Sequence, residues 1–223
     1  MIRSPLSAEP LFHLGPVPVT GPVVTTWGLI AVLSIIAILA TRRLALRPTR
    51  VQAIVELLVT TIADQIRETM RAEPARFLPL IGTLLIFLSA ANLISLLPGF
   101  EPPTAHIETA AALAAIVFVA VHYYGICTRG FVGYLAEFAK PSWVLLPLTL
   151  LSEFTRTFSL MIRLFGNIMS GVFVIGIVLS LAGLFVPIPL MALDLLTGLV
   201  QAYIFTVLAM VFIGSAVETS EKS

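Results

Sequence analysis

The stretch from Leu145 to Leu181 reads LLPLTLLSEFTRTFSLMIRLFGNIMSGVFVIGIVLSL and carries only three charged residues. As one α-helix it would be about 56 Å long, nearly twice the roughly 30 Å of a bilayer's hydrocarbon core. A second apolar segment, residues 190–218, follows the outer turn at Pro187 and Pro189 and is also longer than a perpendicular span requires. We therefore expect 145–181 and 190–218 to form a hairpin of long, strongly tilted membrane helices.

The composition of the whole chain favours a membrane protein. Hydrophobic residues make up 58% of the 223 residues, charged residues make up 11%, and the mean hydropathy is +1.04. These values lie outside the range of ordinary soluble domains. Three further apolar segments, 23–41, 77–98 and 107–128, match the roughly 20 residues that a spanning helix needs. The sequence thus predicts an all-α integral membrane protein with about five membrane helices, a single membrane domain over 1–223, and an outer N-terminal lead over 1–22.

Residues 49–73 differ from the membrane segments because charged residues separate their apolar ones. The apolar residues recur at helical spacing, at Val51, Ile54, Val55, Leu58, Ile62, Ile66 and Met70. Thr49 to Gln52, directly after Pro48, has the form of a capping box at a helix start. This pattern predicts an amphipathic helix that lies along the cytoplasmic surface or against another subunit.

Basic residues gather on alternate connections between the membrane segments. They are Arg42, Arg43, Arg47 and Arg50 after the first segment, and Arg129 and Lys140 after the third. Only Arg3 precedes the first segment, which also lacks the pattern of a cleaved signal peptide. Because basic residues favour cytoplasmic loops, we expect an outer N-terminus and a cytoplasmic C-terminus in a bacterial plasma membrane.

The net charge disfavours nucleic-acid binding, and the number and spacing of cysteine and histidine residues disfavour a disulfide and a metal site. The net charge of +1 offers no basic surface for nucleic acid. Cys127 is the only cysteine, which excludes an intrachain disulfide, and His13, His106 and His122 are too scattered for a metal-ligand pattern. We therefore expect no metal and no other cofactor.

Polar residues form a stripe on each helix of the expected hairpin. On the first helix they recur every three or four residues, at Ser152, Arg156, Ser159, Arg163, Asn167 and Ser170. On the second helix Asp194, Thr197 and Gln201 share one face. The two stripes are expected to face each other or a common partner.

Arg163 is the most costly member of these stripes. An arginine at bilayer depth costs about 2.5–3.5 kcal/mol on insertion scales. Glu153 lies almost three turns away, and Asp194 would lie on the order of 20 Å nearer the outer surface in a straight hairpin. A carboxylate from a second protein, and hence an ionic function, is favoured over a purely structural link between helices. For Arg156 and Glu153, which lie nearer the cytoplasmic end, snorkelling or a local ion pair is as good an explanation as function.

The segment Ser159-Leu-Met-Ile-Arg163-Leu-Phe-Gly-Asn167 resembles the S-L-x-x-R-L-F-G-N motif of subunit a of the F-type ATP synthases. Gln201-Ala-Tyr-Ile-Phe205 is similar to the family's Q-A-[FY]-I-F on the last helix. Asn92-Leu-Ile-Ser-Leu-Leu-Pro98 is similar to N-L-x-x-L-[IL]-P, and Pro102-Pro-Thr-Ala105 also fits. The resemblance covers roughly residues 50–218.

This resemblance implies a role for each polar stripe. Arg163 would be the family's essential arginine, beside a rotating ring of c subunits whose carboxylates carry the transported H⁺ or Na⁺. Two offset half-channels would lead to the ring, and the candidate pathway residues are Asn167, Gln201, Asp194, Thr197, Ser159, Ser170, Arg156 and Glu153. The family's b-type peripheral stalk subunits, the rest of the synthase and membrane lipid would be further partners. The chain itself would catalyse no covalent step.

The sequence also departs from the family pattern. Val172 stands where many members carry an acid, and Asp194 stands where His or Glu is frequent, so the outer half-channel is expected to depend on Asp194. Further departures are His106, Glu108 and Thr149. The short N-terminal lead resembles the divergent bacterial N-type branch, which is thought to export sodium.

Two other classes of function remain as alternatives. A stand-alone secondary ion transporter also places charges at mid-membrane, although such proteins often contain two related halves and no repeat is evident in this sequence. An intramembrane hydrolase would use Ser170 with His122, but no G-x-S-x-G elbow surrounds Ser170.

Overall fold

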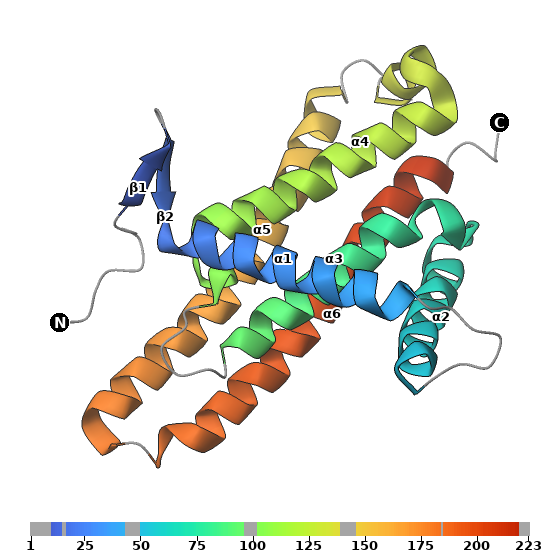
Figure 1. Cartoon of the computed structure of the whole chain (residues 1–223). Coiled ribbons are helices and arrows are strands. Elements are labelled where there is room, and N and C mark those ends of the chain that lie inside the picture. The colour runs from blue at the N-terminus through green and yellow to red at the C-terminus, as the bar shows by residue number, and fades with distance from the viewer. Residues whose placement is uncertain are drawn as a thin grey trace.

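The structure is a computed structural model that describes residues 10–14, 17–42, 50–95, 102–138, 146–183 and 185–218. Its elements, in chain order, are β1 (Pro10–Leu14), β2 (Val17–Thr20), α1 (Gly21–Thr41), α2 (Arg50–Met70), η1 (Pro74–Arg76), α3 (Leu78–Ile94), η2 (Pro103–Ala105), α4 (Ile107–Phe138), α5 (Leu146–Ala182) and α6 (Pro187–Glu218). Long helices dominate the arrangement, and α1 lies across the other membrane helices (Figure 1).

The prediction of an all-α membrane protein with about five membrane helices is confirmed. Four helical segments are long and apolar enough to cross a membrane: Gly21–Thr41, Ile107–Thr128, Leu146–Leu181 and Pro187–Val217. α3 is also apolar but has only 17 residues. It starts with Pro79 in its first turn, where a proline costs no hydrogen bond. The last three residues of the expected 77–98 segment lie outside the described part of the chain.

The N-terminal lead contains structure that the sequence did not predict. β1 and β2 pair as a short antiparallel hairpin, and α1 starts at Gly21, directly after β2. Pro22 lies in the first turn of α1, where its fixed φ suits a helix and its missing N–H is not needed. The first membrane helix therefore starts two residues before the expected residue 23, because Pro22 is accommodated in its first turn.

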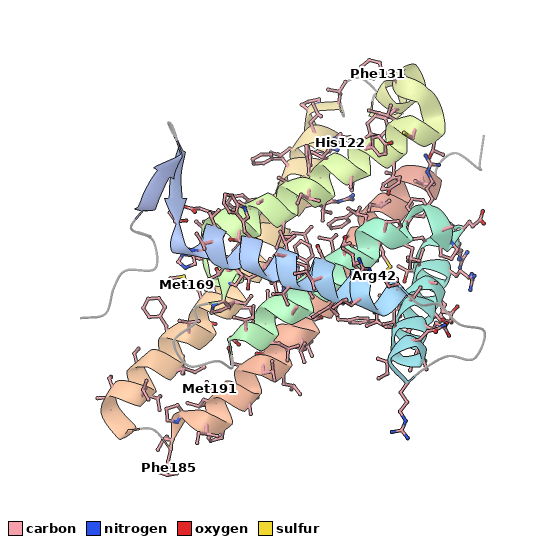
Figure 2. The ribbon with its side chains drawn as sticks, in the orientation of Figure 1. Arg42, His122, Phe131, Met169, Phe185 and Met191 are labelled. Carbon is pink, nitrogen blue, oxygen red and sulfur yellow. The ribbon has the colours of Figure 1, made fainter. Side chains whose placement is uncertain are left out.

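α4 extends beyond the expected end at residue 128. It continues to Phe138 through a break at Gly130, whose φ of 75° and ψ of 161° are open to glycine but not to other residues. Beyond the break the chain folds back, so that the Tyr134 ring lies against Gly125 and edge-on to His122, 5.8 Å between ring centroids. Figure 2 shows Phe131 and His122 at this end of α4.

The core is formed where α3, α4, α5 and α6 meet. Fully buried apolar side chains come from each of these helices, among them Ile81, Leu88, Val117, Leu164 and Phe205. The outer faces remain apolar and exposed, as expected for helices surrounded by lipid: in α1 only Leu29 is buried, and Phe185 projects from the hairpin tip with 84% of its surface exposed (Figure 2).

α2 is the amphipathic helix that the pattern over 49–73 predicts. Its buried face carries Ile62, Ile66 and Met70, which lie in the same core cluster as residues of α3 and α6. Ile54, which the spacing groups with these residues, is instead exposed, as is Leu57. Several of the basic residues that were used to predict orientation, Arg3, Arg43, Arg47 and Lys140, lie outside the described residues. The orientation in the membrane therefore stays a prediction.

Candidate functional site

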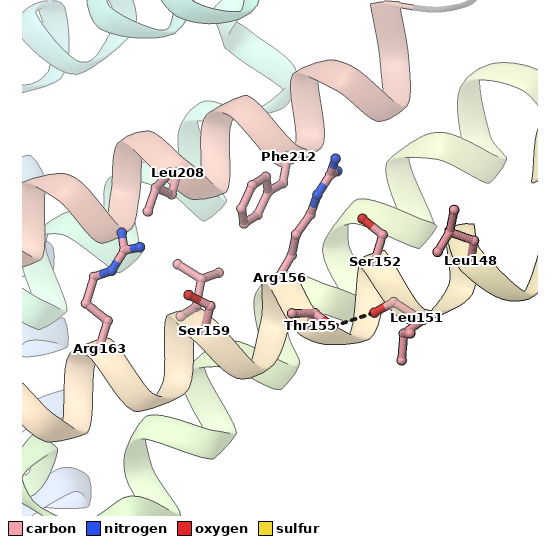
Figure 3. A pocket seen from close by; sticks show the side chains of 10 residues that line it. Leu148, Leu151, Ser152, Thr155, Arg156, Ser159, Arg163, Leu208 and Phe212 are labelled. Atoms are coloured by element: carbon pink, nitrogen blue, oxygen red, sulfur yellow. Dashed lines mark hydrogen bonds between the residues drawn. The ribbon is translucent and has the colours of Figure 1, made fainter.

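A groove of about 520 Å³ runs between the N-terminal half of α5 and the C-terminal half of α6 (Figure 3). Its lining residues are Leu148, Leu151, Ser152, Thr155, Arg156, Ser159, Leu160 and Arg163 of α5, and Leu208 and Phe212 of α6. Four of the six residues in the predicted α5 stripe therefore line one groove: Ser152, Arg156, Ser159 and Arg163. The wall from α6 is apolar, which the sequence did not predict.

Arg163 enters this groove without an anionic partner among the described residues. Its side chain is exposed and points towards Leu208 of α6 (Figure 3). No hydrogen bond or ion pair joins it to another residue in the described part of the chain. A guanidinium has five donors and no acceptor, so in a low-dielectric setting it strongly favours an anion brought from outside the chain.

Arg156, two turns away on the same face, has a different environment. Its Nη1 lies 3.3 Å from Glu153 Oε1, and its Cζ lies 5.5 Å from the centroid of the Phe212 ring. The acid and the aromatic face together stabilise this cation and hold it against α6. Of the two arginines in the groove, Arg156 is thus locally neutralised and Arg163 is not.

The role of Phe212 was missed in the sequence. Its position on α6 gives no polar signal, and helical periodicity does not reveal which residue of a neighbouring helix lies opposite Arg156.

The parts of the two stripes nearer the hairpin tip meet at Asp194 and Gly171. The Asp194 carboxylate packs so closely on Gly171 of α5 that a Cβ added at Gly171 would overlap Asp194 Oδ1. The hydroxyl groups nearby are bonded within their own helices: Thr197 Oγ1 donates to the Asp194 carbonyl at 2.9 Å, and Ser170 Oγ donates to the Asn167 carbonyl at 2.8 Å. Asp194 is therefore the group that joins the two helices here.

Gln201 occupies a third position, inside the bundle. Only 7% of its surface is exposed, and its Nε2 is buried with no hydrogen-bond partner among the described residues. One turn earlier on α6, the Gly198 carbonyl accepts a hydrogen bond of 2.6 Å from Asn92 Nδ2 of α3. The sequence marked Asn92 only as part of a motif. The two stripes thus do not form one continuous face, because Gln201 does not line the groove around Arg163.

The turn before α4 adds buried polar groups. In η2, Thr104 is fully buried and its Oγ1 has no partner among the described residues, and the adjacent His106 is 7% exposed. η2 packs against α5 as well as α4. His106, which departs from the family pattern, is therefore placed in the interior and next to the hairpin.

The hydrolase alternative gains no support from the geometry. His122 Nδ1 lies 2.8 Å from the Phe118 carbonyl, and its ring lies tilted against the Phe118 ring and edge-on to the Tyr134 ring. The Ser170 hydroxyl is bonded to the Asn167 carbonyl. None of these contacts joins the serine to the histidine.

Comparisons with known proteins agree with this architecture. The family described as ATP synthase A chain matches residues 23–214. The chain is 61% identical over 222 residues to "ATP synthase subunit a 2" of Bradyrhizobium sp. (strain BTAi1), with 100% of both chains covered. It is 44% identical over 214 residues to "ATP synthase subunit a 1" of Prosthecochloris aestuarii, covering 95% of this chain and 96% of that one. It is also 45% identical over 195 residues to "ATP synthase subunit a" of Albidiferax ferrireducens, covering 86% and 84%. A match across nearly all the membrane helices, including the groove and both polar stripes, makes this chain a member of the ATP synthase A chain family.

Proposed function

We propose that this chain is the ion-conducting stator subunit of a rotary F-type ATP synthase, with two half-channels for H⁺ or Na⁺ beside a c-ring and Arg163 between them. The observation that carries the proposal is the exposed Arg163 guanidinium, which has no anionic partner among the described residues and lies in a groove on a long apolar hairpin. Membership of the ATP synthase A chain family supports the same role.

The charge of Arg163 explains how such a subunit would work. A fixed cation attracts a ring carboxylate that has released its ion, and so favours that release. The same cation repels H⁺ or Na⁺ and prevents ions from passing directly from one half-channel to the other. Each unit charge that crosses 100 mV releases about 2.3 kcal/mol, so a direct leak would dissipate the driving force. Arginine suits the task because it stays charged even at depth.

The two halves of the site differ in a way that fits two separate pathways. The groove that Arg156 and Ser159 line, with Glu153 paired to Arg156, lies at the N-terminal half of α5, which the predicted topology turns towards the cytoplasm. The Asp194 carboxylate lies near the hairpin tip, which that topology turns outwards. Asn167 and Ser170 on α5, and Thr197 and Gln201 on α6, are the members of the two polar stripes that lie within two turns of this contact along the helices. We assign the first set to the inner half-channel and the second set to the outer one.

The partners of the chain follow from this role. The exposed groove would receive the c-ring, b-type peripheral stalk subunits would hold the chain against it, and lipid would cover the other apolar faces. The protein would lie in a bacterial plasma membrane with its N-terminus outside, and would perform no covalent chemistry itself. A stand-alone transporter would instead move ions after purification without any of these subunits.

Arg163→Ala in the whole complex tests the proposal. In reconstituted vesicles with an imposed ion gradient, we expect assembled Arg163→Ala complexes to make no ATP above background. Arg67→Ala is a suitable control, because Arg67 is an exposed cation on α2 whose only described ion pair, to Asp64 at 2.8 Å, is itself exposed. Normal coupled synthesis by Arg163→Ala, or ion transport by the purified chain alone, would contradict the proposal.

A further inference from the structure

The Asn92 side chain joins two helices that are far apart in the sequence. Its Nδ2 donates a hydrogen bond of 2.6 Å to the Gly198 carbonyl, across 106 residues of chain. Asn92 is 3% exposed and lies in an otherwise apolar face of α3, next to the buried Ala91 and one turn after Leu88. An apolar face gives little preference for one helix register over another, whereas a buried hydrogen bond is directional and short-ranged. Asn92 therefore specifies how α6 sits against α3.

Gly198 is shaped to accept this contact. A Cβ at residue 198 would lie 3.0 Å from Asn92 Cγ and 3.2 Å from each of its terminal atoms, closer than ordinary packing distance. The backbone of α6 is thus brought against the amide without a side chain between them, as small residues permit in membrane helix pairs. At this point α6 can neither slide along α3 nor rotate about its own axis without breaking the contact.

The contact lies in the middle of the polar stripe of α6. Gly198 follows Asp194 by four residues and precedes Gln201 by three, so the three positions share one helical face. Asp194 rests on Gly171 of α5, and Gln201 is buried with a free Nε2 donor among the described residues. A rotation or slide of α6 at Gly198 would move both polar groups together.

We infer that Asn92 is a positioning residue for ion transfer: by holding α6 at Gly198, it keeps the Asp194 carboxylate on α5 and the Gln201 amide directed into the bundle. This inference rests on the proposed function, because it concerns the path along which ions would reach the ring. Asn92 itself need not touch the ion. Its effect is to set the geometry of two groups that lie on another helix.

Asn92→Leu in the whole complex is the first test, since leucine has a similar volume and no donor. We expect ATP-driven uptake, followed with a pH-sensitive dye and with a sodium tracer, to fall on the order of tenfold to a hundredfold in assembled complexes. The matched control is Thr206→Val. Thr206 is also a buried polar residue, but its hydroxyl bonds only within α6, to the Ala202 carbonyl at 2.8 Å. Equal uptake rates for the two variants would overturn the inference.

A distance measurement separates a change of position from a general loss of activity. Spin labels at Leu93→Cys and Val200→Cys, both exposed positions beside the contact, report the separation of α3 and α6 in a Cys127→Ser background. We expect Asn92→Leu to shift or broaden this distance distribution and Thr206→Val to leave it unchanged. A fall in uptake with an unchanged distance would also overturn the inference.

Asn92→Asp provides a readout that remains useful if Asn92→Leu does not assemble. A protonated carboxyl group can still donate to the Gly198 carbonyl, whereas a carboxylate cannot. The uptake rate of Asn92→Asp relative to the unsubstituted complex should therefore rise as the pH falls, and a ratio that does not change with pH counts against the inference. Arg163→Ala in the same vesicles tests the proposed function separately: if that variant transports normally, the proposed function fails, whatever Asn92 does.

Discussion

The Asp194 carboxylate of α6 rests directly on the backbone of α5 at Gly171, where no side chain separates the two helices. This contact places an acidic group between the helices of the hairpin, on the side of Arg163 away from the groove. The Asp194 carboxylate can occupy this position only because residue 171 has no side chain.

Gly171→Ala should therefore displace Asp194. The added Cβ would overlap Asp194 Oδ1, and overpacking of this kind costs about 1–3 kcal/mol unless the acid moves away. We expect coupled ATP synthesis to fall, as measured in reconstituted vesicles. Gly176→Ala on the same helix is the control, because a Cβ there meets nothing within 4 Å. If both variants work equally well, the Asp194 position has no bearing on transport.

Glu153→Gln should impair transport more than stability. The Arg156–Glu153 pair is partly exposed, so its loss costs less than about 1 kcal/mol of folding free energy. Without Glu153, the Arg156 guanidinium would be a second uncompensated cation in the groove beside Arg163. Its charge would repel incoming cations. We expect ion flux to fall on the order of tenfold, equivalent to about 1.4 kcal/mol in the barrier. Flux is compared with the melting temperature of the same complex, and a drop in melting temperature with normal flux would refute this account.

Gly130→Ala should destabilise the end of α4. The φ of 75° and ψ of 161° at Gly130 are strained for any residue with a Cβ, at a cost of about 1–3 kcal/mol. Thermal unfolding in detergent measures the effect, and Gly176→Ala again serves as the control because its φ is not positive. A Gly130→Ala complex as stable as that control would show that the fold-back against Gly125 is not needed.

Gly214→Leu should detach α2 from α6. A Cβ at Gly214 would already be in van der Waals contact with Met70, 3.5 Å from its Cγ, so the remaining atoms of a leucine side chain would press on Met70. We expect the end of α2 to be cleaved faster by protease in purified complexes, while Ile54→Ala on the exposed face of α2 changes little. Equal cleavage rates in the two variants would mean that the α2–α6 contact contributes little to the docking of α2.

Patterns within one helix were predictable from the sequence, and contacts between helices were not. The uncharged runs fixed the number of membrane helices, and the spacing of Arg156, Ser159 and Arg163 placed them on one face. Periodicity cannot tell how far one helix slides along another, so it gave no indication that Phe212 lies over Arg156. The Asn92–Gly198 hydrogen bond could not be predicted for the same reason, since it depends on the register of α3 and α6.

The break at Gly130 was missed for a different reason. A glycine in a helical pattern usually has ordinary helical angles, and nothing in the residues around it shows that this one has a positive φ. The β1–β2 hairpin was missed because the prolines of the lead are atypical of strands.

The open groove around Arg163 also bears on how cells handle this protein before assembly. A newly made copy without its neighbours would present a bare guanidinium to lipid, at a cost of several kcal/mol, together with a broad apolar surface. Such a molecule would gain stability each time a partner covered the groove, and an orphaned copy would be a favoured substrate for membrane proteases. Arg163, to which we assign ion coupling in the proposed function, would thus also act as a checkpoint in biogenesis, because only the completed complex would shield it.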